Sequence, residues 1–290
     1  MDQRVIDLYD RFTHGVIDRR AFLDRLAELA GSTAAALALL PLLKNDYARA
    51  AVVAADDARL TIGSASYDAG DAKITGYLAR LKSGAKRPAV LVIHENRGLN
   101  PHIQDIARRL ALEGFLAFAV DLLSPLGGTP ADEDKARDMI ATLKTEETAH
   151  RAAAAVPFLE RHPESTGKVG AVGFCWGGGG INRIAVLAPD LKAAVAYYGV
   201  QVPADQVPAI RAPLLLHYAG LDQRVNAGIA AYEAALKAND KRYTIYIYPD
   251  VNHAFNNDTS NRYDKQAADL AWSRTVAFFK DNLGAPPSAG

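Results

Sequence analysis

The sequence predicts an α/β fold with a doubly wound, mostly parallel sheet of about eight strands and helices on both faces. Three observations predict it. Six short apolar runs are typical of strands buried on both faces, and they alternate with stretches of helical periodicity. Two further strand-like runs precede them and are joined by a turn, as in a hairpin. The chain has 290 residues, enough to bury one large core.

The predicted elements follow one another in a regular order. The hairpin strands are expected at 60–67 and 73–81, on either side of Asp68-Ala69-Gly70-Asp71. Buried strands are expected at 89–93, 115–120, 169–174, 193–198, 214–218 and 243–248. A helix begins at Pro101, capped by Asn100, and further helices are expected near 131–143, 146–161, 176–187, 227–238 and 263–281. We divide the chain into an N-terminal segment at 1–58, an α/β domain at 59–283 and a loose tail at 284–290.

The N-terminal segment supports two interpretations. Arg19-Arg20-Ala21-Phe22-Leu23 resembles a twin-arginine export signal, the run 31–43 is small and apolar, and Ala48-Arg49-Ala50 has the form of a cleavage site. Against export, charged residues interrupt the apolar region, and apolar residues between Phe22 and Ala30 recur at helical spacing. Cytoplasmic and periplasmic locations therefore both stay open. Because the α/β domain is expected to begin near Arg59, we expect any activity to survive removal of the segment.

Composition excludes several classes of function. The chain has 33 basic and 33 acidic residues, so no net charge attracts nucleic acid or an anionic membrane. It has no run of the roughly 18 apolar residues that stable membrane insertion requires. Its one cysteine cannot form an internal disulfide, and no set of cysteines and histidines has zinc spacing. We therefore expect a small-molecule partner and no metal site; the oligomeric state stays unknown.

The residues that follow strands are the candidates for chemistry, because ligands of doubly wound sheets bind beyond the carboxyl ends of the strands. Gly173-Phe174-Cys175-Trp176-Gly177 lies between a predicted strand and a predicted helix. This is the pattern of a nucleophile elbow with Cys175 as the nucleophile, where the helix N-terminus favours the thiolate. A lone cysteine is more often a buried core residue, but glycines at these offsets favour the nucleophile.

A cysteine nucleophile needs a base, and the base needs a carboxylate that orients it. In folds with this elbow the chain order is nucleophile, acid, histidine. Asp222 follows the strand at 214–218 and His253 follows the strand at 243–248, although Asp222 could instead cap a helix and His253 could be an ordinary loop residue. The other downstream histidine, His217, falls inside a predicted strand and is expected to belong to the core.

These residues make the chain similar to the dienelactone hydrolase (carboxymethylenebutenolidase) family of the α/β-hydrolase superfamily, from about Thr61 to Leu283. The motifs that carry the resemblance are Val92-Ile93-His94-Glu95, Ala119-Val120-Asp121-Leu122, Lys168-Val169-Gly170 through Gly179, Ala196-Tyr197-Tyr198-Gly199, Gly220-Leu221-Asp222 and His253-Ala254-Phe255. The resemblance implies a Cys-His-Asp triad, an acyl-enzyme intermediate, no cofactor, and hydrolysis of an enol lactone or related ester.

The resemblance also implies roles for residues around the triad. Glu95 would contact the resting thiol and help convert it to the thiolate, although it could instead be a structural acid paired with Arg97. The backbone N–H groups of Trp176 and Asn96 would form the oxyanion hole.

The substrate is where the resemblance is weakest. The best-known relatives hold the substrate carboxylate with two arginines, and by position these fall at Pro125 and Asn257. We therefore expect a substrate other than the dienelactone acid. Arg97 and Arg262 are candidates to reach the same space from other loops, although each could instead form a salt bridge.

Two other functions stay open at this point. Cys175 could serve a thiol-dependent redox or peroxide-reducing protein, which would need an external thiol because the chain has no second cysteine. The chain could also be a catalytically silent α/β-hydrolase that binds a ligand. Nitrophenyl esters and a peroxide assay on one preparation would separate the three.

Overall fold

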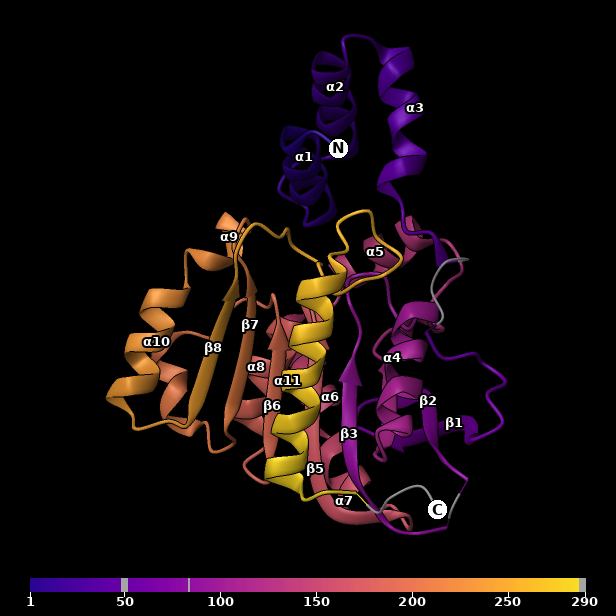
Figure 1. Ribbon diagram of the computed structural model, residues 1–290, viewed down its shortest axis with the longest axis vertical. Coiled ribbons are helices and arrows are strands. Elements are labelled where there is room, and N and C mark those ends of the chain that lie inside the picture. The colour runs from indigo at the N-terminus through magenta and orange to yellow at the C-terminus, as the bar shows by residue number, and fades with distance from the viewer. Residues whose placement is uncertain (48–51, 83, 287–290) are drawn as a thin grey trace.

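An eight-stranded sheet organises the chain, and the prediction of a mixed α/β fold is confirmed (Figure 1). The computed structural model describes residues 1–47, 52–82 and 84–286. The strands lie in the order β1-β2-β4-β3-β5-β6-β7-β8. Their bounds are β1 Leu60–Asp68, β2 Lys73–Leu81, β3 Arg87–Ile93, β4 Leu116–Asp121, β5 Ser165–Phe174, β6 Ala193–Tyr197, β7 Leu214–Ala219 and β8 Tyr243–Tyr248.

The sheet is antiparallel at one edge and parallel elsewhere. The β1–β2 hairpin pairs from Leu60 opposite Leu81 to Asp68 opposite Lys73, and β2 then runs antiparallel to β4. Every neighbouring pair from β4 to β8 is parallel. Strands β3, β4, β6 and β7 are buried along their whole length, as expected of strands covered on both faces. Because these strands are parallel, the loops after their carboxyl ends gather at one edge of the sheet.

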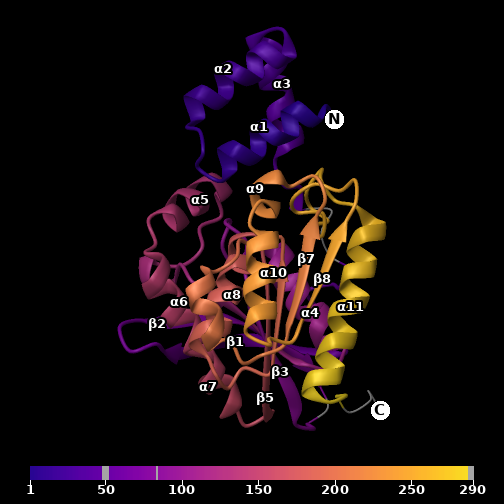
Figure 2. The same cartoon turned by 90° about the vertical axis from the view of Figure 1, so that its left-hand side faces the viewer.

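Helices cover both faces of the sheet. The α-helices after the N-terminal segment are α4 Pro101–Leu112, α5 Glu133–Ala141, α6 Thr145–Ala153, α7 Ala155–Glu160, α8 Trp176–Leu187, α9 Gln223–Asn226, α10 Ile229–Ala238 and α11 Lys265–Leu283. Two short 3-10 helices, η2 Ser124–Leu126 and η3 Ala204–Ala209, lie among them. Helices α4 and α11 pack on one face, and α6, α7, α8 and α10 pack on the other (Figures 1 and 2). The two faces carry separate apolar clusters, as a doubly wound sheet requires.

The helix predicted at 146–161 is interrupted in the structure. It forms two helices, α6 and α7, that meet at Ala154. Pro157 explains the break, because proline has no N–H to donate to the carbonyl group four residues earlier and its ring clashes with that group. The prediction of one continuous helix there was therefore wrong.

Three helices of the N-terminal segment lie beyond the carboxyl edge of the sheet (Figures 1 and 2). They are α1 Gln3–Thr13, α2 Arg19–Ala30 and α3 Thr33–Leu43. Their apolar side chains pack on one another in a cluster of their own, which includes Phe12, Phe22 and Leu26. Within the described residues no single helix is long and apolar enough to cross a membrane; α2 and α3 meet that test only as a pair bent by 110°. The Ala48-Arg49-Ala50 motif lies outside the described residues.

Candidate active site

Cys175 sits on the sharp turn between β5 and α8. Its backbone has φ 56° and ψ −115°, a left-handed conformation that costs energy for any residue with a Cβ atom. The turn is possible because the residues two positions away on each side are glycines: a Cβ atom at Gly173 would lie 2.3 Å from the Gly177 carbonyl oxygen. The Cys175 side chain is buried, and its backbone N–H donates to the Tyr197 carbonyl oxygen at 3.0 Å. The predicted elbow is therefore present, with the sulfur at the N-terminus of α8.

His253 and Asp222 form a buried pair beside the elbow. His253 Nδ1 lies 2.6 Å from Asp222 Oδ2, and a ring nitrogen of His253 lies within 4.8 Å of Cys175 Sγ. Asp222 Oδ1 also accepts from the Val225 N–H at 3.1 Å, so Asp222 both caps α9 and orients His253. Burial would raise the pKa of Asp222, but the charge of His253, its hydrogen bond and Arg224 lower it overall. The carboxylate is thus ionised and holds the imidazole.

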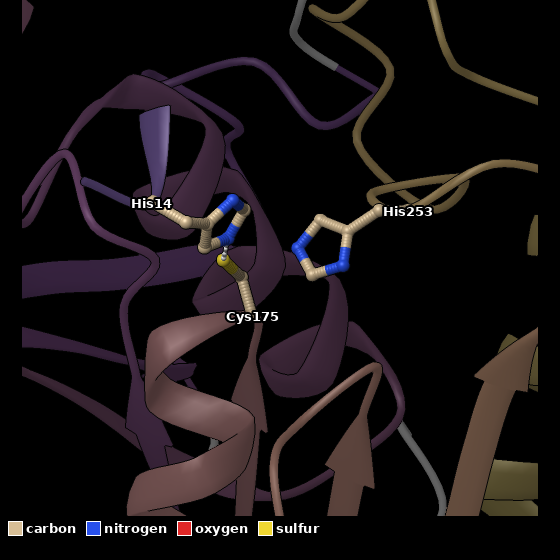
Figure 3. A group of neighbouring side chains, drawn as sticks. All are labelled: His14, Cys175 and His253. Carbon is tan, nitrogen blue, oxygen red and sulfur yellow. Dashed lines mark hydrogen bonds between the residues drawn. The ribbon is translucent and has the colours of Figure 1, made fainter. Parts of the chain in front are cut away.

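A second histidine, which sequence analysis missed, contacts the thiol. His14 ends α1, and its Nε2 lies 3.3 Å from Cys175 Sγ (Figure 3). Its Nδ1 faces Asp10, at 2.8 Å from the carbonyl oxygen and 3.3 Å from the carboxylate Oδ1. Its ring also meets the ring of His253 edge to face, with 4.8 Å between centroids. Cys175 Sγ therefore lies within 4.8 Å of ring nitrogens of two histidines that are far apart in the sequence.

Asp10 is held by arginines from the segments that carry Asp222 and His253. Arg262 Nη1 donates to Asp10 Oδ1 at 3.2 Å, and Arg224 Nε lies 3.5 Å from Oδ2. Burial would raise the pKa of Asp10, but His253, His14 and Arg262 lower it well below its usual range. Asp10 is therefore ionised at the centre of a cluster that joins the N-terminal segment to the body.

Glu95 is buried at the end of β3 and has two hydrogen-bond donors. Asn257 Nδ2 donates to Glu95 Oε2 at 2.6 Å, and the Tyr198 hydroxyl donates to Oε1 at 3.3 Å. Among the described residues the thiol has a hydrogen-bond contact with His14, and the contact of Glu95 with the resting thiol stays a prediction. Burial and the charge of Glu95 raise the pKa of Tyr198, which keeps that hydroxyl neutral and able to donate.

The two predicted oxyanion donors, Trp176 and Asn96, come from different elements of the chain. Trp176 is the first residue of α8, where backbone N–H groups have no partner within the helix. Asn96 lies in the loop after β3, and its side-chain Nδ2 donates to the Thr13 carbonyl oxygen at 2.8 Å. Both residues line the main cavity. The role of their backbone N–H groups as oxyanion donors stays a prediction.

The arginines proposed from sequence lie in ion pairs. Arg97 is buried, with Nε 3.8 Å from Glu133 Oε2, and Arg262 binds Asp10. Both line a small cavity of about 20 Å³ next to the sulfur, and neither lines the large one. Of the two positions where arginines are missing, Pro125 lies in η2 and Asn257 binds Glu95.

A cavity of about 790 Å³ opens beside the thiol, between the N-terminal segment and the body. Cys175, His14 and His253 all line it. Its apolar wall combines side chains of the segment and of the body: Phe12, Ile17, Leu122, Ile140, Leu143, Trp176 and Val200. Arg183 of α8 also lines it and donates to the Gly179 carbonyl oxygen at 3.3 Å. A substrate of this volume would contact both parts of the chain.

His217 has the core position predicted for it. It lies in β7, fully buried, with Nε2 3.1 Å from Thr275 Oγ1 and Nδ1 2.9 Å from the Tyr248 hydroxyl. Burial lowers its pKa to about 3, so the ring is neutral. His253 is therefore the downstream histidine at the site.

The sequence held one signal for the missed pair. Asp10 and His14 are four residues apart, which places two side chains on the same face of a helix. Nothing local indicates what that face contacts.

Comparisons with known proteins agree with the geometry. A family model described as the dienelactone hydrolase family matches residues 74–283, and a second, described as YqhI-like, matches residues 1–32. An Escherichia coli K12 protein assigned as a carboxymethylenebutenolidase is 31% identical over 249 residues, covering 80% of this chain and 92% of that protein. A Bradyrhizobium protein assigned as a 2-oxo-3-(5-oxofuran-2-ylidene)propanoate lactonase is 29% identical, covering 71% and 89%.

Solved structures show the same similarity. A Klebsiella pneumoniae protein assigned as a dienelactone hydrolase superposes with a TM-score of 0.70 at 29% identity, covering 76% of this chain and 98% of its own. The dienelactone hydrolase-like promiscuous phosphotriesterase P91, from metagenomic libraries, has a TM-score of 0.70 at 26% identity, covering 78% and 100%. These comparisons favour neither the redox alternative nor the silent one.

Proposed function

The chain belongs to the dienelactone hydrolase family, and from this premise we propose that it cleaves a carboxylic ester or lactone through a triad of Cys175, His253 and Asp222. The family and the names of the relatives support a lactone or ester hydrolase. The observation that carries the triad is the buried 2.6 Å pair of His253 and Asp222 beside a strained cysteine elbow. A nucleophile, a base and an orienting carboxylate in this arrangement are the requirements of acyl transfer.

The reaction divides into two steps at the sulfur. The Cys175 thiolate attacks the carbonyl carbon, and the oxyanion accepts hydrogen bonds from the backbone N–H groups of Trp176 and Asn96. The intermediate collapses and the bond to the leaving oxygen breaks. The proton that the Cys175 thiol gave to a histidine then passes to that oxygen. A water molecule then loses a proton to His253 and attacks the thioester, which releases the acid and regenerates the thiolate.

Ester hydrolysis by the purified full-length chain tests the proposed function. We expect turnover of short-chain nitrophenyl esters, with loss of activity after alkylation of Cys175. Peroxide consumption measured on the same preparation is the comparison. Peroxide reduction with an added thiol, in protein that hydrolyses no ester or lactone, would favour the redox alternative instead.

Glu95→Gln is expected to lower kcat by about tenfold or more, because the carboxylate that helps form the thiolate is removed while its shape is kept. Asn257 and Tyr198 already surround the group, so we expect little change in the melting temperature. Steady-state kinetics and thermal unfolding measure the two effects. Glu113→Gln is the matched control. Glu113 caps the C-terminus of α4 and forms an ion pair with Lys280. Unchanged kcat in Glu95→Gln would leave Glu95 a structural residue.

The neutral methyl ester of the dienelactone acid is expected to be cleaved better than the free acid. The two positions where relatives carry arginines hold Pro125 and Asn257, and a charged contact of this kind is worth about 2–5 kcal/mol. We expect a ratio of kcat/KM of about tenfold or more in favour of the ester. A preference for the free acid would contradict this, and Arg183 on the cavity wall would then be the first residue to replace.

A further inference from the structure

Helix α1 brings a second imidazole–carboxylate pair to the nucleophile. His14 Nε2 lies 3.3 Å from Cys175 Sγ, and Asp10 contacts the other ring nitrogen. We propose that the N-terminal segment is part of the active site and that His14, positioned by Asp10, is a catalytic residue that takes the thiol proton of Cys175. This inference rests on the proposed function, because it assigns a base to the same nucleophile.

The surroundings of His14 determine which ring nitrogen carries a proton. Its Nδ1 lies 2.8 Å from the Asp10 carbonyl oxygen, which can only accept a hydrogen bond. Nδ1 therefore keeps its hydrogen, and the lone pair of Nε2 points at the sulfur. Transfer of the proton from Sγ to Nε2 leaves a thiolate beside an imidazolium, which the Asp10 carboxylate stabilises. Burial lowers the pKa of His14, but Cys175 and Asp10 raise it overall, which favours the same transfer.

His14 and His253 can act as bases in different steps of the reaction. His253 Nε2 is buried and has no hydrogen-bond partner among the described residues, so it is free to bind water. The proton that His14 took from the thiol passes to the leaving oxygen in the first step. In the second step His253 takes the proton of the attacking water and gives it to the departing thiolate, which restores the resting thiol. Every proton is thus accounted for without another reactant.

The contacts of the segment indicate a permanent part of the enzyme. Asp10 has only 15% of its side chain exposed, and its partners Arg224 and Arg262 belong to the loops that carry Asp222 and His253. Burying a carboxylate costs desolvation free energy, which charged hydrogen-bond donors on the facing surface must offset. Those donors are present, and Asn96 adds a hydrogen bond to the Thr13 carbonyl oxygen. The N-terminal segment is therefore complementary, in charge and hydrogen bonding, to the loops that carry Asp222 and His253.

The test uses full-length His14→Gln. The amide keeps much of the shape of the ring but accepts no proton, so less thiolate forms near neutral pH. We expect the rate of iodoacetamide alkylation at Cys175 to fall about tenfold at pH 6–7, with its rise displaced to higher pH. We expect kcat/KM for nitrophenyl esters to fall about 10- to 100-fold. His150→Gln, at an exposed histidine of α6, should match the wild type in both measurements.

Further variants separate a chemical role from a structural one. Imidazole added to His14→Ala should restore part of the activity, which a role in packing alone would not allow. Asp10→Asn should displace the alkylation profile in the same direction, while Asp7→Asn, at an exposed position on the same helix, should not. Circular dichroism and melting temperature show whether each variant is folded.

Three results would overturn the inference. They are a wild-type alkylation profile in folded His14→Gln, an increase in its kcat/KM, and full activity in native protein that begins at Ala51. Failure of the proposed function looks different: wild type and His150→Gln would then both hydrolyse no ester, while the alkylation profiles would still report on His14.

Discussion

Cys175→Ala is expected to lower kcat/KM for ester hydrolysis by about 10⁴-fold or more, because a nucleophile and its base act as a unit and the loss of one removes the covalent route. Cys175→Ser should retain weak activity, since a histidine that serves a thiolate deprotonates a hydroxyl poorly. Both replacements are small and stay in a buried elbow between glycines, so we expect the fold to persist. Steady-state kinetics with nitrophenyl esters measures the loss.

Iodoacetamide gives an independent check of the same residue. Cys175 is the one cysteine in the chain, so a single adduct by mass spectrometry locates the modification. Full activity in protein that is quantitatively alkylated would contradict the triad and the proposal for His14 together. Protection of Cys175 by a bound ester, compared with unprotected enzyme, would place the substrate at the sulfur.

His253→Gln is expected to lower kcat by about 10³- to 10⁴-fold, because the acyl-enzyme then has no base to activate water. Asp222→Asn should cost a similar factor, since an amide at the 2.6 Å contact favours the wrong tautomer of the imidazole. The side-chain oxygen of asparagine can still accept from the Val225 N–H, so α9 keeps its cap. Stopped-flow kinetics should show a burst of nitrophenol and slow turnover if deacylation is the damaged step.

His217→Gln is the matched control for the histidine. His217 is a core residue bound to Thr275 and Tyr248, so its replacement should lower the melting temperature while kcat changes little. An activity loss in His217→Gln as large as that in His253→Gln, with both proteins folded, would mean that the base is wrongly identified.

The export interpretation of the N-terminal segment stays a prediction. The twin-arginine pair opens α2, and the Ala48-Arg49-Ala50 motif lies outside the described residues. N-terminal sequencing of protein from its own cell decides whether the chain is cleaved after Ala50. From the sequence we expect activity to survive removal of the segment, whereas the inference for His14 requires activity to be lost. N-terminal sequencing combined with an activity assay of the cleaved protein distinguishes the two.

The sequence by itself determined the sheet and the position of the cysteine elbow. In runs that are largely apolar, such as 89–93 and 214–218, the side chains on both faces of a strand must be removed from water. Such runs therefore predict strands covered on both faces, and both are buried in the structure. The elbow at Cys175 follows from local sterics, since Gly173 and Gly177 are required for strand and helix to approach so closely. Chain order then placed Asp222 and His253 in consecutive loops at the carboxyl edge, because parallel strands end together.

Only the tertiary structure decided what surrounds Cys175. The four-residue spacing of Asp10 and His14 defines a helix face, but its contact with Cys175 spans 161 residues and depends on how α1 docks. The same docking places Arg262 in an ion pair with Asp10, although its sequence position suggested a substrate contact. Local periodicity and turn chemistry act over a few residues. The partner of a buried charge depends instead on which surfaces pack together. No local pattern in a single sequence encodes that pairing.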